Sequence, residues 1–460
     1  MLLSSLASSI ATIGLPTLAQ AFNATFQDVQ WVVLAYLLAI TSLIVSVGRL
    51  GDMLGRRRLM LAGIALFTAA SALCGIAPTL WLLIAARAVQ GLGAAIMMAL
   101  TMALLGETVT KAKTGSAMGL LGSMSAIGTA LGPTLGGVLI AGGGWRAIFL
   151  INLPLGLLAF GLAARHLPAA RPLAQAERVR FDHLGTLLLV ITLAAYALAM
   201  TVGRGSFGLL NAALLFAAAT GAGLFLRVES KAASPLIRLA MFRDSTLGAS
   251  FAMSALVMTV MMATLVVGPF YLSTALGLDA ARVGLAMSSG PIISALAGMP
   301  AGRIVDRFGA PRMSIAGLSS MAAGACALPL LPVRLGVLGY IVPLIVITAG
   351  YALFQAANNT AVMADVRPDR RGVVSGLLNL ARNLGLITGT AVMGSVFALG
   401  AATSEISTAH PEAVALGMRT TFAVAATLIA VALAIALASH ALSQRGVSSR
   451  GEREDGRSVG

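Results

Sequence analysis

The chain consists largely of apolar runs of about 20 residues separated by short polar segments, and this pattern limits the folds open to it. A helix of about 20 apolar residues crosses the roughly 30 Å hydrocarbon core of a bilayer. Only 10% of the 460 residues are charged, whereas a soluble domain carries about 25%. The sequence therefore predicts an all-α integral membrane protein.

The apolar runs predict fourteen transmembrane helices in groups of six, two and six. Their predicted bounds are Leu2–Ala21, Trp31–Leu50, Leu59–Ala77, Leu80–Leu105, Ser116–Ala141, Ala147–Arg165, Leu184–Val202, Leu209–Leu226, Leu247–Leu276, Arg282–Val305, Met313–Leu331, Leu335–Ala364, Gly372–Leu399 and Met418–Leu442. The predicted domains are an N-terminal six-helix bundle, a cytoplasmic linker, an inserted helix pair, a second linker, a C-terminal six-helix bundle and a disordered cytoplasmic tail. In that order they cover residues 1–165, 166–183, 184–226, 227–246, 247–442 and 443–460.

Lysines and arginines are distributed unevenly over the predicted loops. If the N-terminus is inside, the cytoplasmic loops hold most of the 31 basic residues. The outer loops hold only Arg146, Arg204, Arg282, Arg334 and Arg419. Because cytoplasmic loops are enriched in Lys and Arg, the bias predicts a plasma-membrane protein with both termini in the cytoplasm. The formal charge of +15 is thus a topology signal, and we expect the lipid bilayer, not nucleic acid, as the partner.

Two short basic stretches are nearly the same. "GRLGDMLGRRR" (Gly48–Arg58) and "GRIVDRFGAPR" (Gly302–Arg312) each follow the second helix of a six-helix half. This repeat indicates duplicated halves, a transporter plan with the substrate site between them. We predict that each aspartate locks neighbouring helix ends together by charge; the alternative is a hairpin turn that only fixes topology. The predicted lock residues are Gly48, Asp52, Gly55, Arg56, Gly302, Asp306, Arg307 and Gly309.

A glycine pattern marks the fifth predicted span. Gly128, Gly132 and Gly136 recur every four residues and share one helix face, which lets helix backbones approach closely. Pro133 lacks an amide donor and bends a helix, and Gly137 ends the pattern. We predict a hinge at the interface between the halves; the alternative is a packing face alone.

Arg87 lies inside the fourth predicted span, where an unpaired guanidinium costs roughly 2.5–3.5 kcal/mol or more. Gln90 follows at i+3 and shares its face. We therefore expect Arg87 to face a polar cavity or a partner. The alternative is a side chain that reaches outward to the membrane surface.

Two further spans carry polar stripes that we predict to line a central cavity, because polar side chains turn away from lipid. Hydrogen bonding between helices is the alternative. The stripes are Gln355, Asn358 and Asn359 in the twelfth predicted span and Asn379, Arg382 and Asn383 in the thirteenth, each at i, i+3 and i+4, and Tyr36 is an aromatic candidate for the same cavity.

In combination these motifs resemble the major facilitator superfamily, and in particular its fourteen-helix drug:proton antiporter subfamily. "GRLGDMLGRRR" resembles the cytoplasmic signature loop, and "RAVQGLGAA" (Arg87–Ala95) resembles the fourth-helix signature. "GTALGPTLGG" (Gly128–Gly137) resembles the fifth-helix signature of antiporters, and "WRAIFLINLPLG" (Trp145–Gly156) resembles the stretch that follows it. The resemblance implies proton coupling through Arg87 and a fifth helix that helps to seal against proton leak.

The predicted function is a monomeric, secondary active, proton-coupled exporter of small amphiphilic compounds such as drugs, working by alternating access. Members of the subfamily often carry an aspartate where Ala7 lies, and none of the 16 acidic residues here falls in the middle of a predicted span. Arg87 and Arg382 without a buried carboxylate favour neutral or anionic substrates. The alternatives are a metabolite or sugar exporter or importer of the same fold, a non-transporting sensor and a membrane enzyme.

Other chemistry has no support in the sequence. No catalytic constellation, metal-ligand spacing or phosphate-binding glycine loop occurs. We therefore expect no enzymatic activity, no cofactor, no bound metal and no direct use of ATP. Cys74 and Cys326 lie in apolar runs, where cysteine acts as a small hydrophobic residue.

Overall fold

The computed structural model describes residues 1–108, 114–167, 183–202, 208–231, 245–364, 371–403, 406 and 409–455. These residues are almost entirely helical, and they contain no β-strand. Most of the two predicted linkers lies outside the described residues. The backbone at Gly48 and Asp52 is helical, but the Asp52 side chain is outside the described part.

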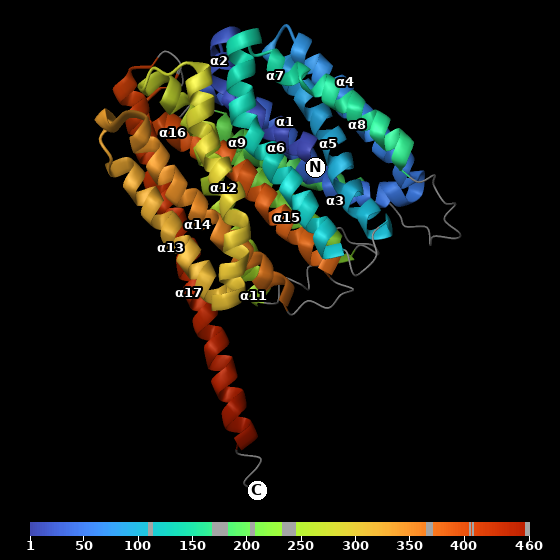
Figure 1. Ribbon diagram of the computed structural model, residues 1–460, viewed down its shortest axis with the longest axis vertical. Helices are drawn as coiled ribbons and strands as arrows, with labels where there is room; N and C mark the ends of the chain where they lie inside the picture. Colours follow the sequence, from blue (N-terminus) through green and yellow to red (C-terminus); the bar gives the residue numbers. More distant parts are fainter. Residues whose placement is uncertain are drawn as a thin grey trace.

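The helices form two bundles that lie side by side, with an inserted pair (Figure 1). The N-terminal bundle contains α1 (Leu2–Ile13), α2 (Leu15–Phe22), α3 (Phe26–Leu54), α4 (Arg56–Ile76), α5 (Leu80–Thr108), α6 (Thr114–Gly143), α7 (Ala147–Leu150) and α8 (Asn152–His166). The inserted pair consists of α9 (His183–Thr201) and α10 (Leu209–Lys231). The C-terminal bundle contains α11 (Ser245–Phe270), the π-helical turn η3 (Tyr271–Ala275), α12 (Ala280–Phe308), α13 (Ala310–Leu330), the short turn η4 (Val333–Leu335), α14 (Gly336–Ala364), α15 (Arg371–Thr388), the π-helical turn η5 (Gly389–Met393), α16 (Gly394–Gly400) and α17 (Pro411–Asp455).

Twelve helices of the described part are long and apolar enough to cross a membrane, judged by length and composition. The bent pair α1–α2 raises this number to thirteen if it forms one span. The count of fourteen predicted from the sequence is therefore not supported by the described residues: it also includes α6, whose described apolar segment, Ile127–Gly143, is shorter than the twelve.

The first predicted span is broken where α1 meets α2, with a bend of 58°. Pro16 lies in the first turn of α2, where its ring lacks an amide donor and clashes with the preceding helical turn. A Cβ atom on Gly14, the residue between the two helices, would lie 2.8 Å from the Ile148 side chain. The bend therefore combines a proline with a close packing contact at Gly14.

Equivalent glycines end equivalent helices in the two bundles. Gly55 separates α3 from α4 with φ 89° and ψ 120°, and Gly309 separates α12 from α13 with φ 85° and ψ 144°. Positive φ values of this kind favour glycine, because it has no Cβ. The repeated sequence therefore forms the same sharp reversal twice.

The helix pair that follows each reversal also packs in the same way. In the N-terminal bundle a Cβ on Gly93 would lie 2.8 Å from the Gly63 carbonyl oxygen, so that α4 and α5 touch backbone to backbone. In the C-terminal bundle a Cβ on Gly350 would lie 2.6 Å from the Gly317 carbonyl oxygen, which brings α13 equally close to α14. These contacts support an internal duplication independently of the loops.

The last helix extends further than the sequence predicts. α17 continues to Asp455 and projects beyond the bundles (Figure 1), whereas the sequence analysis expects a disordered tail from residue 443. The chain contains no proline after Pro411, so nothing interrupts the helical hydrogen bonds.

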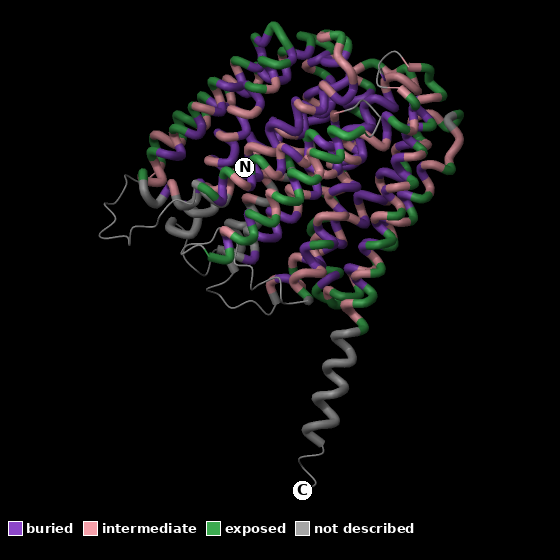
Figure 2. The backbone as a smooth tube through the Cα atoms, turned by 180° about the vertical axis from the view of Figure 1, so that it is seen from behind, coloured by how far each residue is buried: buried purple, intermediate pink, exposed green. Residues whose placement is uncertain are grey.

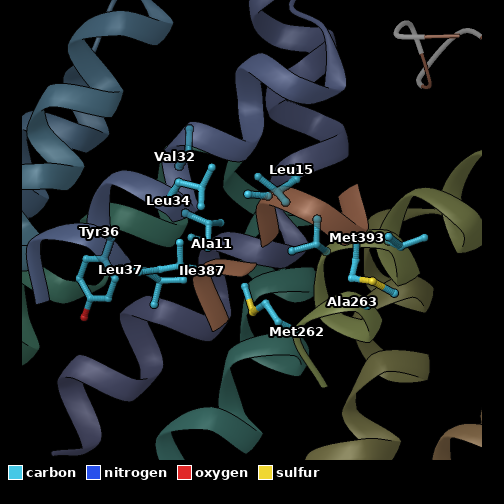
Figure 3. Close-up of a cluster of buried hydrophobic side chains, with 14 of the residues drawn as sticks. Ala11, Leu15, Val32, Leu34, Tyr36, Leu37, Met262, Ala263, Ile387 and Met393 are labelled. Atoms are coloured by element: carbon cyan, nitrogen blue, oxygen red, sulfur yellow. The ribbon is translucent and has the colours of Figure 1, made fainter. Parts of the chain in front are cut away.

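Buried residues concentrate along the middle of the molecule, where the two bundles meet (Figure 2). In the close-up of this seam, apolar residues of α1, α2 and α3 face those of α11, α15 and η5 (Figure 3). The labelled residues are Ala11, Leu15, Val32, Leu34, Tyr36, Leu37, Met262, Ala263, Ile387 and Met393. Since this seam is apolar and buried, the polar groups that reach it stand out as candidates for function.

Candidate functional site

Aromatic side chains of the two bundles meet at one end of the molecule, which we call the Trp145 end; the opposite end is the Arg56 end. At the Trp145 end the Phe26 ring of α3 lies 4.7 Å from the Phe270 ring of α11 and 5.3 Å from the Phe397 ring of α16, both edge to face. Such pairs stabilise an interface beyond the area that they bury. The aromatic cluster therefore closes the seam at this end.

α6 and α12 form a second contact between the bundles near the same end. A Cβ on Gly284 of α12 would lie 2.5 Å from the Pro133 carbonyl oxygen, and one on Gly137 would lie 2.6 Å from the Ala280 carbonyl oxygen. The Thr134 and Ser288 hydroxyls are hydrogen bonded across this contact. The two helices thus touch backbone to backbone, and the Pro133–Gly137 face of α6 lies against the opposite bundle.

The other glycine face of α6 packs on α1 of its own bundle. Gly128 and Gly132 lie so close to α1 that a Cβ on either would overlap Leu2 or Ser9, and a Cβ on Gly136 would lie 3.0 Å from Ile10. From the sequence, the fifth span is expected to form a hinge at the interface between the halves. In the structure its Gly128, Gly132 and Gly136 face packs inside the N-terminal bundle, whereas Pro133 and Gly137 of the same motif contact the opposite bundle. The hinge itself stays a prediction.

Gln30 connects α3 to the π-helical turn η5 of the other bundle. Its Nε2 donates a hydrogen bond to the Thr390 carbonyl oxygen over 3.0 Å, and the residue is 0% exposed. Gly394 follows η5, and a Cβ there would overlap the Gln30 amide. π-helical turns are frequent at functional sites, and here the turn and a glycine together receive a buried amide from the opposite bundle.

The inserted helix α9 bridges the same seam. Trp31 of α3 donates its ring N–H to the Thr201 hydroxyl over 3.2 Å, which ties α9 to the N-terminal bundle. On the other side, the Tyr196 hydroxyl donates to the Thr388 hydroxyl over 3.1 Å, and the Ser395 hydroxyl donates to the Met200 carbonyl oxygen. The inserted pair is therefore attached to both bundles.

Arg87 is enclosed within the N-terminal bundle and is 0% exposed. Its Nε donates to the Val32 carbonyl oxygen over 2.9 Å, and its Nη1 donates to the Ala7 carbonyl oxygen over 3.3 Å. The guanidinium carbon lies 4.2 Å from the centre of the Tyr36 ring, a favourable cation–π arrangement. Its Nη2 is buried without a hydrogen-bond partner among the described atoms. The contacts are all neutral, so the positive charge is not balanced by a carboxylate.

Gln90 extends this cluster to a fourth helix. It accepts a hydrogen bond from Arg87 Nη1 over 2.5 Å and donates one to the Ser71 hydroxyl of α4 over 2.6 Å. Tyr36, whose ring carries the cation, donates its hydroxyl to the Ser4 carbonyl oxygen over 2.8 Å. The structure therefore brings Arg87, Gln90 and Tyr36 together, as a closed network and not as an open surface.

The polar residues of α14 and α15 in the C-terminal bundle are more accessible than the Arg87 network. Arg382 of α15 donates through Nη2 to the Asn359 side-chain oxygen of α14 over 2.5 Å, and both residues are half-buried. Gln355, Asn379 and Asn383 are also half-buried. The structure thus brings the two predicted stripes together at Arg382 and Asn359.

Asn358, the neighbour of Asn359 on α14, contacts α11 and not Arg382. It is 1% exposed and donates to the Ser254 hydroxyl over 2.9 Å and to the Ser250 carbonyl oxygen over 3.4 Å, both in α11. This amide holds α14 against α11, which matches the alternative of hydrogen bonding between helices.

Of the two predicted lock loops, only the second has described side chains at its aspartate. Asp306 is exposed, and the Arg307 guanidinium lies 5.3 Å from the centre of the Phe308 ring. Nothing lies within 4 Å of a Cβ on Gly302 or on Gly309. In the first loop, Arg57 donates to the Ala164 carbonyl oxygen of α8 over 2.6 Å. The lock itself stays a prediction, because the Asp52 side chain lies outside the described part.

Three residues of the candidate site are not recognised from the sequence: Gln30 and Thr390 at the seam, and Tyr351 within the C-terminal bundle. Gln30 and Thr390 meet only because α3 and η5 belong to different bundles, and no sequence signal pairs them. Tyr351 lies one turn before Gln355 on the same face of α14 and contacts the Met258 sulfur of α11 through its hydroxyl, 3.9 Å away. Its i−4 spacing from Gln355 is a signal that extends the polar stripe by one turn.

Comparison with known proteins gives a consistent result. Residues 1–390 match the Major Facilitator Superfamily. The chain is 32% identical to the multidrug resistance protein Stp of Mycobacterium tuberculosis (strain CDC 1551 / Oshkosh), over 85% of this chain and 72% of that protein. It is 30% identical to the riboflavin transporter RibZ of Clostridioides difficile (strain 630), over 94% of this chain and 93% of that protein. Among solved structures, a bacterial homologue of the human lysosomal transporter Spinster, inward-facing and unoccupied, matches with a TM-score of 0.69 at 16% identity, over 95% of this chain and 94% of that one.

Proposed function

Because the chain belongs to the major facilitator superfamily, and is therefore a multi-pass membrane protein of a transporter family, we propose that it exports small amphiphilic compounds such as drugs in exchange for protons. Its similarity to a multidrug resistance protein over most of the chain supports efflux. The antiporter-like segment "GTALGPTLGG" supports exchange. The family and the fold are those of transporters, not of enzymes.

The observation that carries this proposal is the position of α6. One glycine face packs on α1 of its own bundle, and the neighbouring Pro133–Gly137 face packs on α12 of the other bundle. Alternating access requires two bundles that rock about a shared contact. A backbone-to-backbone contact without intervening side chains is suited to such a pivot, because little has to repack when the crossing changes.

We further propose fourteen spans, with α6 as the fourteenth. Its 30 residues extend for about 45 Å at 1.5 Å per residue, which exceeds the roughly 30 Å of hydrocarbon. An even number of spans places both termini on one side, and the basic loops at the Arg56 end make that side the cytoplasm. The proposed units remain two six-helix bundles and an inserted pair, acting as a monomer.

In this orientation the closed Trp145 end faces outward, and the conformation is inward-facing. The Phe26 and Gln30 contacts support this assignment, because both close the seam at the outer end. The similarity to an inward-facing transporter of the same fold supports it as well. Export would begin with a compound entering from the cytoplasm between the bundles.

Transport in proteoliposomes with an imposed pH gradient tests this function. A difference of one pH unit supplies about 1.4 kcal/mol per proton, enough for a tenfold concentration ratio of a neutral compound. We expect members of a chemically diverse panel to move against their gradients while protons move with theirs, and a protonophore to stop this accumulation. Movement that persists unchanged when the protonophore is added would contradict antiport.

A second candidate is the export or import of a metabolite. It is favoured by the similarity to a riboflavin transporter, which extends over 94% of this chain. Including riboflavin in the panel separates the two candidates, because a dedicated metabolite transporter would move it and leave the lipophilic compounds behind.

A further inference from the structure

One face of the C-terminal bundle carries polar and aromatic groups that are not sealed inside it. Tyr351, Gln355 and Asn359 recur every four residues on α14 and are half-buried. Arg382 of α15 lies against them through its hydrogen bond to Asn359. We call Tyr351, Gln355, Asn359, Arg382 and Met258 the Arg382 face.

Among the residues that the structure describes, no carboxylate is paired with Arg382. The hydrogen-bond partner that it has in the described part is the neutral amide of Asn359, and neither Asp nor Glu occurs in the middle of α11, α14 or α15. A charged side chain at this depth is costly unless it is paired or hydrated. A bound carboxylate would balance the guanidinium and form two parallel hydrogen bonds with it, which is the strongest pairing that arginine makes.

Of the two arginines that lie well inside predicted spans, Arg87 and Arg382, only Arg382 is placed to receive a ligand. Arg87 is 0% exposed and closed in by Val32, Ala7 and the Tyr36 ring. Arg382 is half-buried. Its Nη2 holds the Asn359 oxygen, which leaves other guanidinium N–H groups for an incoming anion.

Beside the charge lies an apolar surface that can adapt. The Tyr351 hydroxyl lies 3.9 Å from the Met258 sulfur. Gly385 allows α15 to approach α11 next to Met258, because a Cβ added to Gly385 would lie 2.7 Å from the Met258 Cβ. Methionine is flexible and polarizable, and it is common at surfaces that accept varied partners. An aromatic ligand body therefore has Tyr351 and Met258 to pack against while its charged group reaches Arg382.

We propose that the Arg382 face binds the transported compound and selects organic anions, in particular aromatic carboxylates, over organic cations. This inference rests on the proposed exporter function and names its substrate class. In this proposal Arg382 and Asn359 bind the charged group of the ligand, and Tyr351 and Met258 pack against its aromatic body.

A matched series of probes tests the selection. Naphthylacetate, naphthylacetamide and naphthylethylammonium share a ring system and differ in the charge of the head group. With the purified full chain in lipid nanodiscs, equilibrium dialysis should show that the carboxylate binds about tenfold or more tightly than the cation, a difference of about 1.4 kcal/mol or more. Equal or tighter binding of naphthylethylammonium would overturn the proposal.

Two variants, with one control, test whether the preference for the carboxylate depends on Arg382 and Asn359. Arg382→Gln should weaken naphthylacetate binding about tenfold or more and leave naphthylacetamide nearly unchanged, whereas Arg334→Gln, in an exposed turn of the same bundle, should change neither. Asn359→Asp should have the same effect on the carboxylate and strengthen binding of the cation, because it places a carboxylate against Arg382. This variant keeps the size of the side chain and its contact, so it tests the proposal even if Arg382→Gln does not fold.

Failure of the proposed anion site can be distinguished from failure of the proposed exporter function. Proton-driven movement of naphthylethylammonium that is unaffected by Arg382→Gln would overturn the anion site and leave export intact. Selective binding of naphthylacetate without any proton-driven flux would leave the site intact and contradict export. Unchanged naphthylacetate affinity in both Arg382→Gln and Asn359→Asp would also overturn the site.

Discussion

Gly394→Leu is expected to lower transport about tenfold or more while the protein still inserts into the membrane. A side chain at this position would overlap the amide of Gln30, a residue that is 0% exposed. The displaced amide would lose its bond to Thr390. Overpacking costs about 1–3 kcal/mol, and such a cost applied to one of two conformations changes their ratio roughly 5- to 150-fold.

The control is Gly161→Leu in α8, where nothing lies within 4 Å of the added Cβ. Two alanine substitutions test whether the loss of transport is caused by steric overlap. Gly394→Ala alone should impair transport, and adding Gln30→Ala should restore it in part by removing the atoms that collide. If Gly394→Leu transports as well as Gly161→Leu, the contact between α3 and η5 has no part in the cycle.

Arg87→Leu is expected to abolish measurable transport and to lower the thermal stability of the purified protein. The substitution removes the donor to the Val32 and Ala7 carbonyl oxygens and to Gln90. It also removes the cation–π contact with Tyr36. Hydrogen bonds to charged groups contribute about 1.5–3 kcal/mol each, so α1, α3 and α5 should lose much of what holds them in register. Flux in proteoliposomes and thermal unfolding check the two effects.

Arg146→Leu is the matched control, because that guanidinium also lies over an aromatic ring, 4.4 Å from the centre of Trp145, but is exposed. It should change neither flux nor stability appreciably. Arg87→Leu with normal flux would show that the buried cation is a packing element that the transport cycle does not use.

The positions of most spans were predictable from the sequence because each membrane helix can be recognised from its own residues, without knowledge of its neighbours. Length and apolarity suffice for each of them, and the twelve helices that pass this test lie within the predicted runs or overlap them closely. The duplication was also predictable, because the reversals at Gly55 and Gly309 depend on local glycine conformations that leave a mark in the sequence.

Contacts between bundles were not predictable in the same way. The glycine face of α6 was recognised, but its partner is α1 and not the opposite bundle, since spacing identifies a face without naming its neighbour. Gln30 was missed because a single polar residue in a span acquires meaning only from what lies across the seam. Tyr351 was missed although its spacing from Gln355 places it on the polar stripe of α14. Asn358 shares a stripe with Asn359 by spacing, yet one turns to α11 and the other to Arg382.

The account depends on two bundles that alternate between closure at the Trp145 end and closure at the Arg56 end. Distances between spin labels measure this directly. Labels at exposed Trp81 and Leu330 report on the Trp145 end, in a background in which Cys74 and the exposed Cys326 are replaced by alanine.

Labels at exposed Arg58 and Arg312 report on the Arg56 end of the same two bundles. When the pH is varied in lipid nanodiscs, the account predicts that one distance lengthens as the other shortens, and that Gly394→Leu shifts the population toward a longer Trp81–Leu330 distance. Two distances that stay fixed under every condition, or that lengthen and shorten together, would contradict it.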